Sequence, residues 1–154
     1  MSTLRAARFA ILFLLFSGIA AAQTPLPSSE PVWSVDFVKP KPGRHDQAMQ
    51  YFNQSWLRAR DIAKEKGAIV DFHILEEPSA GEADAWQIIL MTEYRDQAAY
   101  DARESAFGPI HHKLFPDGPP TVNGLTRKEL FDITSSRTLH DMTSAAGPYF
   151  KKVD

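Results

Sequence analysis

The chain contains no cysteine among its 154 residues, and this absence excludes several kinds of site and anchorage. Without thiols there are no disulfides, no thiolate metal ligands and no lipid-modified cysteine. We therefore expect the folded protein to be stabilised by packing of its core or by association with a second copy.

Motifs of the common nucleotide-dependent and hydrolytic enzymes are also missing. The chain has no G-x-S-x-G turn, no glycine-rich phosphate loop and no G-x-G-x-x-G fingerprint. It has neither H-E-x-x-H nor H-x-x-x-H, and the acidic segment 76–84 lacks the spacing of a calcium loop. We expect no metal site, and hydrolase or nucleotide-dependent functions are disfavoured.

Residues 1–22 have the features of a bacterial secretory signal peptide. Arg5 and Arg8 precede the unbroken apolar run 9–16, and residues 20–22 are the small alanines typical of a cleavage site. The apolar run is short for a membrane span, which makes an uncleaved anchor the weaker alternative. We expect a periplasmic or secreted protein with no membrane attachment after cleavage.

Charge and length bound the mature chain further. Of the 17 Lys and Arg residues, two lie in the signal peptide, which leaves 15 against 19 Asp and Glu. A net charge of about −4 argues against binding to nucleic acid or to anionic membranes. The remaining length suits one domain. We expect a flexible leader at 23–31, a folded domain at 32–142 and a C-terminal tail at 143–154.

Hydrophobic periodicity predicts alternating strands and helices in this domain. Alternation of apolar and polar residues indicates strands at 32–38, 69–75 and 137–142. Segment 85–94 is apolar on both faces, so we expect it to be a central strand. Apolar residues at steps of three and four predict a long helix over 44–66.

The second half of the chain carries weaker helix signals. Asp96 is a suitable N-cap for a helix over 97–107, which we expect the Gly108-Pro109 pair to break. The segment 126–129 fits a capping box, and helical spacing of apolar residues continues to Ile133. The predicted order is therefore β-α-β-β-α-β, the ferredoxin-like pattern, with an antiparallel sheet and helices on one face.

Several of these segments together resemble the dimeric α+β barrel superfamily. They are W-x-V-x-F-V followed by K-P-x-P-G, the long helix with Phe52 and Trp56, and M-T-E-Y-R-D before the second helix. The resemblance covers roughly residues 32–142 and implies a homodimer in which two sheets close into a barrel. Members include cofactor-free monooxygenases, haem enzymes and stress-responsive proteins, so the fold implies no single activity.

Polar residues on the predicted strands suggest one candidate site. Asp36, Asp71 and His73 each lie on the polar face of a strand, as do Ser34, Gln87 and Glu93. If these faces share one side of the sheet, Asp36 or Asp71 beside His73 could act as an acid/base pair. The alternative is a hydrogen-bonded network at a dimer interface or at the barrel ends.

His111 and His112 form a second candidate site. Neighbouring residues on a helix point about 100° apart, so these two cannot both bind one metal from regular helical geometry. In haem-binding members of the superfamily a helix-borne histidine ligates iron, so the resemblance implies a haem ligand at His111 or His112. The favoured interpretation is a polar helix end, where positive charge suits the helix dipole.

The aromatic residues are expected mainly in the core, although some could line a pocket for a flat apolar ligand. They are Trp33, Phe37, Phe52, Trp56, Phe72, Trp86 and Tyr94. We therefore expect an exported, dimeric protein without a cofactor that binds a small apolar molecule or has a role in envelope stress. The alternative function is a monooxygenase-like or haem-using oxidoreductase.

Overall fold

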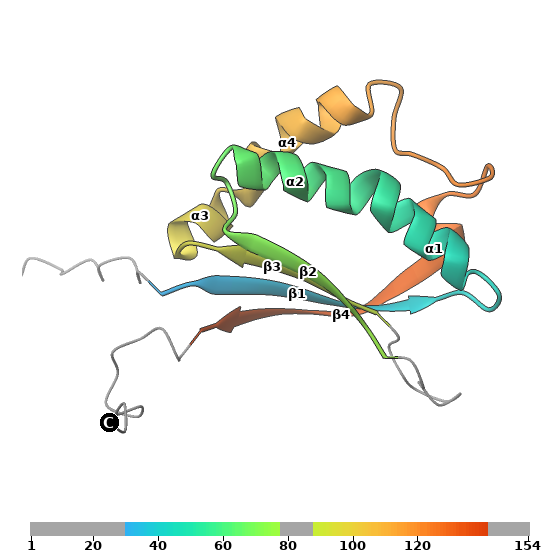
Figure 1. The fold of residues 1–154 in the computed structure, drawn as a ribbon, viewed down its shortest axis with the longest axis horizontal. Helices are drawn as coiled ribbons and strands as arrows, with labels where there is room; N and C mark the ends of the chain where they lie inside the picture. The colour runs from blue at the N-terminus through green and yellow to red at the C-terminus, as the bar shows by residue number, and fades with distance from the viewer. Residues whose placement is uncertain (1–29, 78–87, 142–154) are drawn as a thin grey trace, which may run out of the picture.

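The computed structural model describes residues 30–77 and 88–141, which form an α+β fold (Figure 1). All helices of these ranges lie on one side of an antiparallel sheet. The predicted signal peptide, most of the leader, the residues Trp86 and Gln87, and the predicted tail lie outside the described residues. None of the described helices is both long and apolar enough to cross a membrane.

The sheet contains four strands in the order β2-β3-β1-β4, with every neighbouring pair antiparallel. They are β1 (Val32–Pro40), β2 (Asp71–Glu76), β3 (Ile88–Tyr94) and β4 (Phe131–His140). Strands β1 and β3 are central. The central position of β3 was predicted, because a strand with neighbours on both edges and apolar residues on both faces has little contact with water.

Strand β4 begins six residues before the start predicted from sequence. The capping box at Thr126 and Glu129 is present, but helix α5 ends after one turn (Arg127–Leu130). The expected continuation of this helix to Ile133 was wrong. Phe131 and Ile133 instead pair with Pro40 and Val38 of β1, and these ladder contacts outweigh the local helical spacing.

The long helix predicted over 44–66 is continuous but not uniform. It consists of α1 (His45–Tyr51), a π-helical segment η1 (Phe52–Leu57) and α2 (Arg58–Glu65). The Ser55 hydroxyl donates a 2.7 Å hydrogen bond to the Tyr51 carbonyl inside this wider turn. A π turn accommodates one extra residue, so the side chains on either side of it face in different directions from those of a regular helix.

The second helical region is longer than predicted. It comprises α3 (Gln97–Asp101) and α4 (Arg103–Leu114), and the Asp96 side chain caps α3 by accepting a 2.7 Å hydrogen bond from the Ala99 amide. The expected break at Gly108-Pro109 was wrong. Pro109 faces solvent between the buried residues Phe107 and Ile110, so the helix loses one hydrogen bond but keeps its packing.

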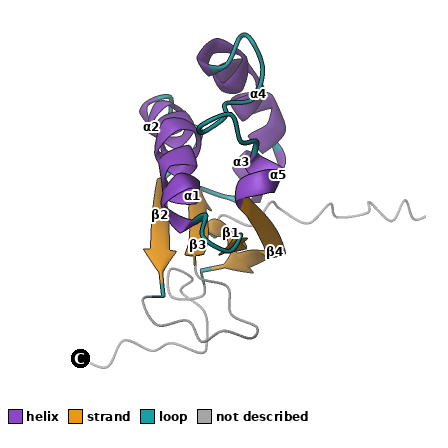
Figure 2. Cartoon of the chain, turned by 90° about the vertical axis from the view of Figure 1, so that its right-hand side faces the viewer, coloured by secondary structure: helices purple, strands orange, loops and turns teal. Residues whose placement is uncertain are grey.

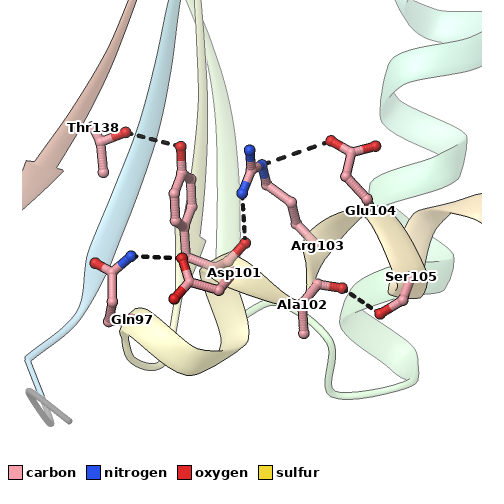
Figure 3. A network of polar contacts seen from close by, with 8 residues as sticks. Gln97, Asp101, Ala102, Arg103, Glu104, Ser105 and Thr138 are labelled. Atoms are coloured by element: carbon pink, nitrogen blue, oxygen red, sulfur yellow. Dashed lines mark hydrogen bonds and ion pairs between the residues drawn. The ribbon is translucent and has the colours of Figure 1, made fainter.

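Polar contacts fix the junction of α3 and α4 beside β4 (Figure 3). The Tyr100 hydroxyl lies 2.9 Å from the Thr138 hydroxyl of β4. At the same junction, Arg103 donates to the Tyr100 carbonyl at 3.0 Å, and the Ser105 hydroxyl donates to the Ala102 carbonyl at 2.8 Å. These contacts hold the start of α4 in place and so help to set where its C-terminal end lies.

The space between helices and sheet is filled by two groups of buried side chains. The first group lies under α1, η1 and α5, and the second under α2 and α4; Figure 2 shows these helices standing over the sheet. The first group is Val38, Ala48, Tyr51, Phe52, Ile88, Leu90, Val122, Leu130 and Phe131. The second is Val32, Ala59, Ala63, Ile69, Tyr94, Phe107 and Ile110.

The sheet side turned away from the helices, here called the open face, is also largely apolar. Register places Trp33, Val35 and Phe37 of β1 on it, next to Ile89 and Met91 of β3. On the outer strands, Leu75 is 48% exposed and Leu139 is 49% exposed. No described helix covers this face (Figure 1). The second copy predicted from sequence would pack on this face, and dimer formation stays a prediction.

Candidate functional site

A cleft of about 450 Å³ lies between the helices and the helix-facing side of the sheet. This volume is within the range of sites that bind small molecules. The long helix, the C-terminal end of α4, the loop after it and the start of β4 form the walls, and the middle of the sheet contributes to the lining. The lining residues are Asp36, Tyr51, Phe52, Ser55, Trp56, Arg60, Leu90, His111, His112, Phe115, Gly118, Pro119, Pro120, Arg127, Phe131 and Ile133.

Aromatic rings make up much of the cleft wall. The ring of Phe131 lies 4.7 Å from that of Phe52 and 5.6 Å from that of Tyr51, measured between centroids. Behind the lining, the ring of Phe72 packs edge-on against Trp56 at 5.8 Å. Contacts of this kind hold each ring in one orientation, so the wall is largely preformed. Phe115 completes the aromatic part of the lining.

The π-helical segment supplies three of the lining side chains. Phe52, Ser55 and Trp56 all belong to η1 and all reach the cleft. Residues three and four positions apart share one face of a helix, so the spacing of Phe52, Ser55 and Trp56 places all three on the side that faces the cleft. The sequence contains no proline or glycine between residues 45 and 65, so no local signal marked this distortion.

Arg60 is the charged residue placed deepest against the cleft wall. Its Nε donates a 2.9 Å hydrogen bond to the Thr92 hydroxyl of β3, and its Cζ lies 3.9 Å above the centre of the Trp56 ring. Burial lowers the pKa of Arg60 to about 10, so it is still charged at neutral pH. No carboxylate among the described residues lies within 4.0 Å of its side-chain nitrogens.

Sequence analysis missed Arg60, although a signal was present. Arg60 follows Trp56 by four residues and precedes Ala63 by three, so it lies on the apolar stripe of the predicted helix. A charged residue at such a position is expected to face the interior. Asp36, which sequence analysis did single out, lies in the same cleft lining and accepts a 2.5 Å hydrogen bond from the Ser136 hydroxyl.

The condition for an acid/base pair of Asp36 with His73, that both lie on one side of the sheet, is not met. Asp36 pairs with Leu90 on the helix-facing side, whereas His73 pairs with Met91 on the open face. Leu90 and Met91 are neighbours in β3, and neighbouring residues of a strand point to opposite sides of the sheet. The sheet therefore separates these two side chains.

Asp71 and His73 do lie near each other, at the edge strand β2. His73 Nε2 is 3.8 Å from Asp71 Oδ2, and the His73 ring stacks on Trp33 with 5.9 Å between centroids. Lys64 contacts the other Asp71 oxygen at 2.8 Å, and this hydrogen bond is the main cause of the lowered pKa of Asp71. No described cavity includes these residues, and a catalytic role for them stays a prediction.

His111 and His112 lie in the last turn of α4, and both line the cleft. The ring of His111 is 5.8 Å from that of Phe107. Burial lowers the pKa of His111, and the nearby charge of Arg60 lowers it further. The two histidines are therefore at a helix end, as favoured from sequence, but they also contribute to a cavity that sequence alone could not place. The described residues contain no cluster of three or more side chains that could hold a metal ion.

Comparison with known proteins gives no family for this chain. No protein-family model matches it, and no curated protein matches it. A conserved protein of unknown function from Bacteroides thetaiotaomicron, described as a possible oxidoreductase, has a TM-score of 0.46 at 10% identity, covering 74% of this chain and 100% of that one. A conserved protein from Methanosarcina mazei has a TM-score of 0.41 at 16% identity, covering 73% and 92%. Similarity at this level carries no inference about activity.

Proposed function

We propose that the protein binds a small, mainly apolar molecule in the cleft between its helices and its sheet. The observation that carries this proposal is a cavity of about 450 Å³ lined by Tyr51, Phe52, Trp56, Phe115 and Phe131. Sites for small organic ligands combine such apolar walls with a few polar groups that fix the orientation of the ligand.

The proposed setting of this site is an exported homodimer with ferredoxin-like topology. The strand order β2-β3-β1-β4 and the helices on one side of the sheet support that topology. The exposed side chains of Leu75 and Leu139 on the open face support pairing with a second copy, because apolar groups are unfavourable in water. Export rests on the features of residues 1–22. A role in envelope stress would be compatible with that location.

The binding proposal can be tested with the neutral fluorescent probe N-phenyl-1-naphthylamine. We expect saturable binding with increased fluorescence to the mature protein. Ile133→Trp adds a large ring at the cleft, where Ile133 is 42% exposed, and should weaken binding about fivefold or more. Leu139→Trp is the matched control, because Leu139 is similarly exposed on the same strand but lies on the open face.

Each outcome bears on where the ligand binds. Absence of saturable binding to the wild-type protein would contradict the proposal. Weakening by Leu139→Trp rather than by Ile133→Trp would place the probe on the open face instead of in the cleft. Circular dichroism of both variants checks that each substitution leaves the fold intact.

A second candidate function is haem binding, favoured by the presence of both His111 and His112 in the cleft lining. If haem were bound, either imidazole could ligate its iron, and Arg127 in the same lining could pair with one of its carboxylates. Bound haem would supply any redox chemistry. Titration with haemin should then give a sharp Soret band that is lost in His111→Ala or His112→Ala. A flat titration, or a band that survives both substitutions, would contradict this function.

A further inference from the structure

We infer that the ligand of this cleft carries a carboxylate that binds the guanidinium of Arg60, and that its remaining part is a planar aromatic ring system. This inference rests on the proposed function, since it names the chemical class of the molecule bound at the same site. It is carried by the unused hydrogen-bonding capacity of Arg60, the charge of the cleft lining and the arrangement of its rings.

The guanidinium of Arg60 has donors that no described residue uses. A guanidinium has five N–H groups, and the Nε group is used by Thr92. The two Nη groups make no hydrogen bond to any described residue. A partly buried cation without a counter-ion is costly, and a carboxylate can accept hydrogen bonds from the two Nη groups. Thr92 is only 2% exposed, so the contact that orients Arg60 lies in the core.

The charge of the cleft lining differs in sign from the net charge of the chain. The whole protein has a formal net charge of −2, yet the cleft contains Arg60 and Arg127 against the single carboxylate of Asp36. Neither arginine forms an ion pair with a described residue. The hydroxyl of Ser136 already donates to Asp36. A cleft with this balance favours an anion over a neutral or cationic ligand.

The aromatic side chains of the cleft lining favour a planar ligand. The Cζ of Arg60 lies over the Trp56 ring, 3.9 Å from the ring centre, so the cation and an aromatic surface stand side by side in the cleft lining. The rings of Tyr51 and Phe131 contribute further aromatic surface to the same cavity. The indole nitrogen of Trp56 is buried with no hydrogen-bond acceptor, so this wall holds a second donor without a protein partner. Rings stack on such a wall in offset arrangements that a flexible chain cannot reproduce.

The test compares two probes of nearly the same shape, anionic 2-naphthoate and neutral 2-naphthamide, by isothermal titration calorimetry on the mature protein at pH 7. We expect the acid to bind roughly tenfold or more tightly than the amide, because hydrogen bonds to a charged group are stronger than neutral ones. Arg60→Met should remove most of this preference, measured as the ratio of the two dissociation constants, because it removes the charged donors. Arg60→Lys should restore part of it. Arg58→Met, on the exposed side of the same helix, is the matched control and should leave the preference unchanged.

The outcomes separate this inference from the proposal on which it rests. Equal binding of acid and amide by the wild-type protein would overturn the carboxylate assignment while leaving a ligand-binding cleft intact. A preference that survives Arg60→Met would assign the anion to another group and also overturn the inference. Decanoate binding as tightly as 2-naphthoate would overturn the aromatic part. If neither 2-naphthoate nor 2-naphthamide binds while N-phenyl-1-naphthylamine still does, the stated ligand class alone is contradicted. If none of the three probes binds, the proposed function is contradicted as well.

Discussion

Phe52 belongs both to the core and to the lining of the proposed site, and truncating it tests the core assignment. Its side chain is 1% exposed, and its ring lies 4.7 Å from that of Phe131 and 6.4 Å from that of Tyr51. Phe→Ala substitutions in protein cores cost roughly 3–5 kcal/mol of unfolding free energy. Because Phe52 also lines the cleft, the space left by the ring joins a volume that water can enter. We therefore expect Phe52→Ala to destabilise the protein by about 3 kcal/mol, the low end of that range.

The assay is urea unfolding followed by circular dichroism, with the stability change taken from the midpoint at unchanged slope. Phe115→Ala is the matched control, since Phe115 lines the same cleft but is only partly buried. It should cost about 1 kcal/mol. Equal losses for the two variants, or a loss below about 1 kcal/mol for Phe52→Ala, would refute the assignment of Phe52 to the core.

Three further predictions concern the site, a titrating contact and the open face. Thr92→Val should reduce the preference for 2-naphthoate over 2-naphthamide in calorimetry, because Thr92 orients Arg60; an unchanged preference would show that this contact is not needed for recognition. The pKa of His45 is raised above 6.5, mainly by its hydrogen bond with Asp46, so the stabilisation from this contact is full below pH 6.5 and is lost as pH rises through the folded-state pKa. An NMR titration should show this pKa falling in Asp46→Asn, and a pKa at or below 6.5 in the wild-type protein would contradict the contact. Light scattering of the mature protein at micromolar concentration should give a dimer, which Leu75→Glu on the open face should weaken; a wild-type monomer would rule out the paired sheets.

Most of the elements of the fold could be predicted from the sequence because their periodicity reflects tertiary burial. The stripe on the long helix and the two apolar faces of β3 both correspond to contacts seen in the structure. The start of β4 could not be predicted, because Phe131 is held in a strand by pairing with Pro40, about ninety residues earlier in the chain. Local sequence contains no information on such a partner.

The behaviour of Pro109 shows a similar limit. Proline is unfavourable inside a helix, so the helix predicted from sequence ends at Phe107, before Gly108 and Pro109. In the structure, buried contacts of Phe107 and Ile110 flank the exposed Pro109, and α4 continues to Leu114. This extra length is what brings His111 into the cleft lining. The packing of Phe107 and Ile110 therefore outweighs the unfavourable effect of Pro109 on the helix, and His111 lies at the cleft as a result.

Sequence locates a site residue less well on a strand than on a helix, and the geometry of strands explains why. Alternation along one strand tells which residues share a side, but it does not tell which side of one strand matches that of the next. Asp36 and His73 therefore looked equivalent, although register places one beneath the helices and the other on the open face. A helix is less ambiguous, because its apolar stripe must face the core. A charge on that stripe is therefore a stronger indication of an interior site than a charge on a strand, and Arg60 is the residue in this chain to which that reasoning applies.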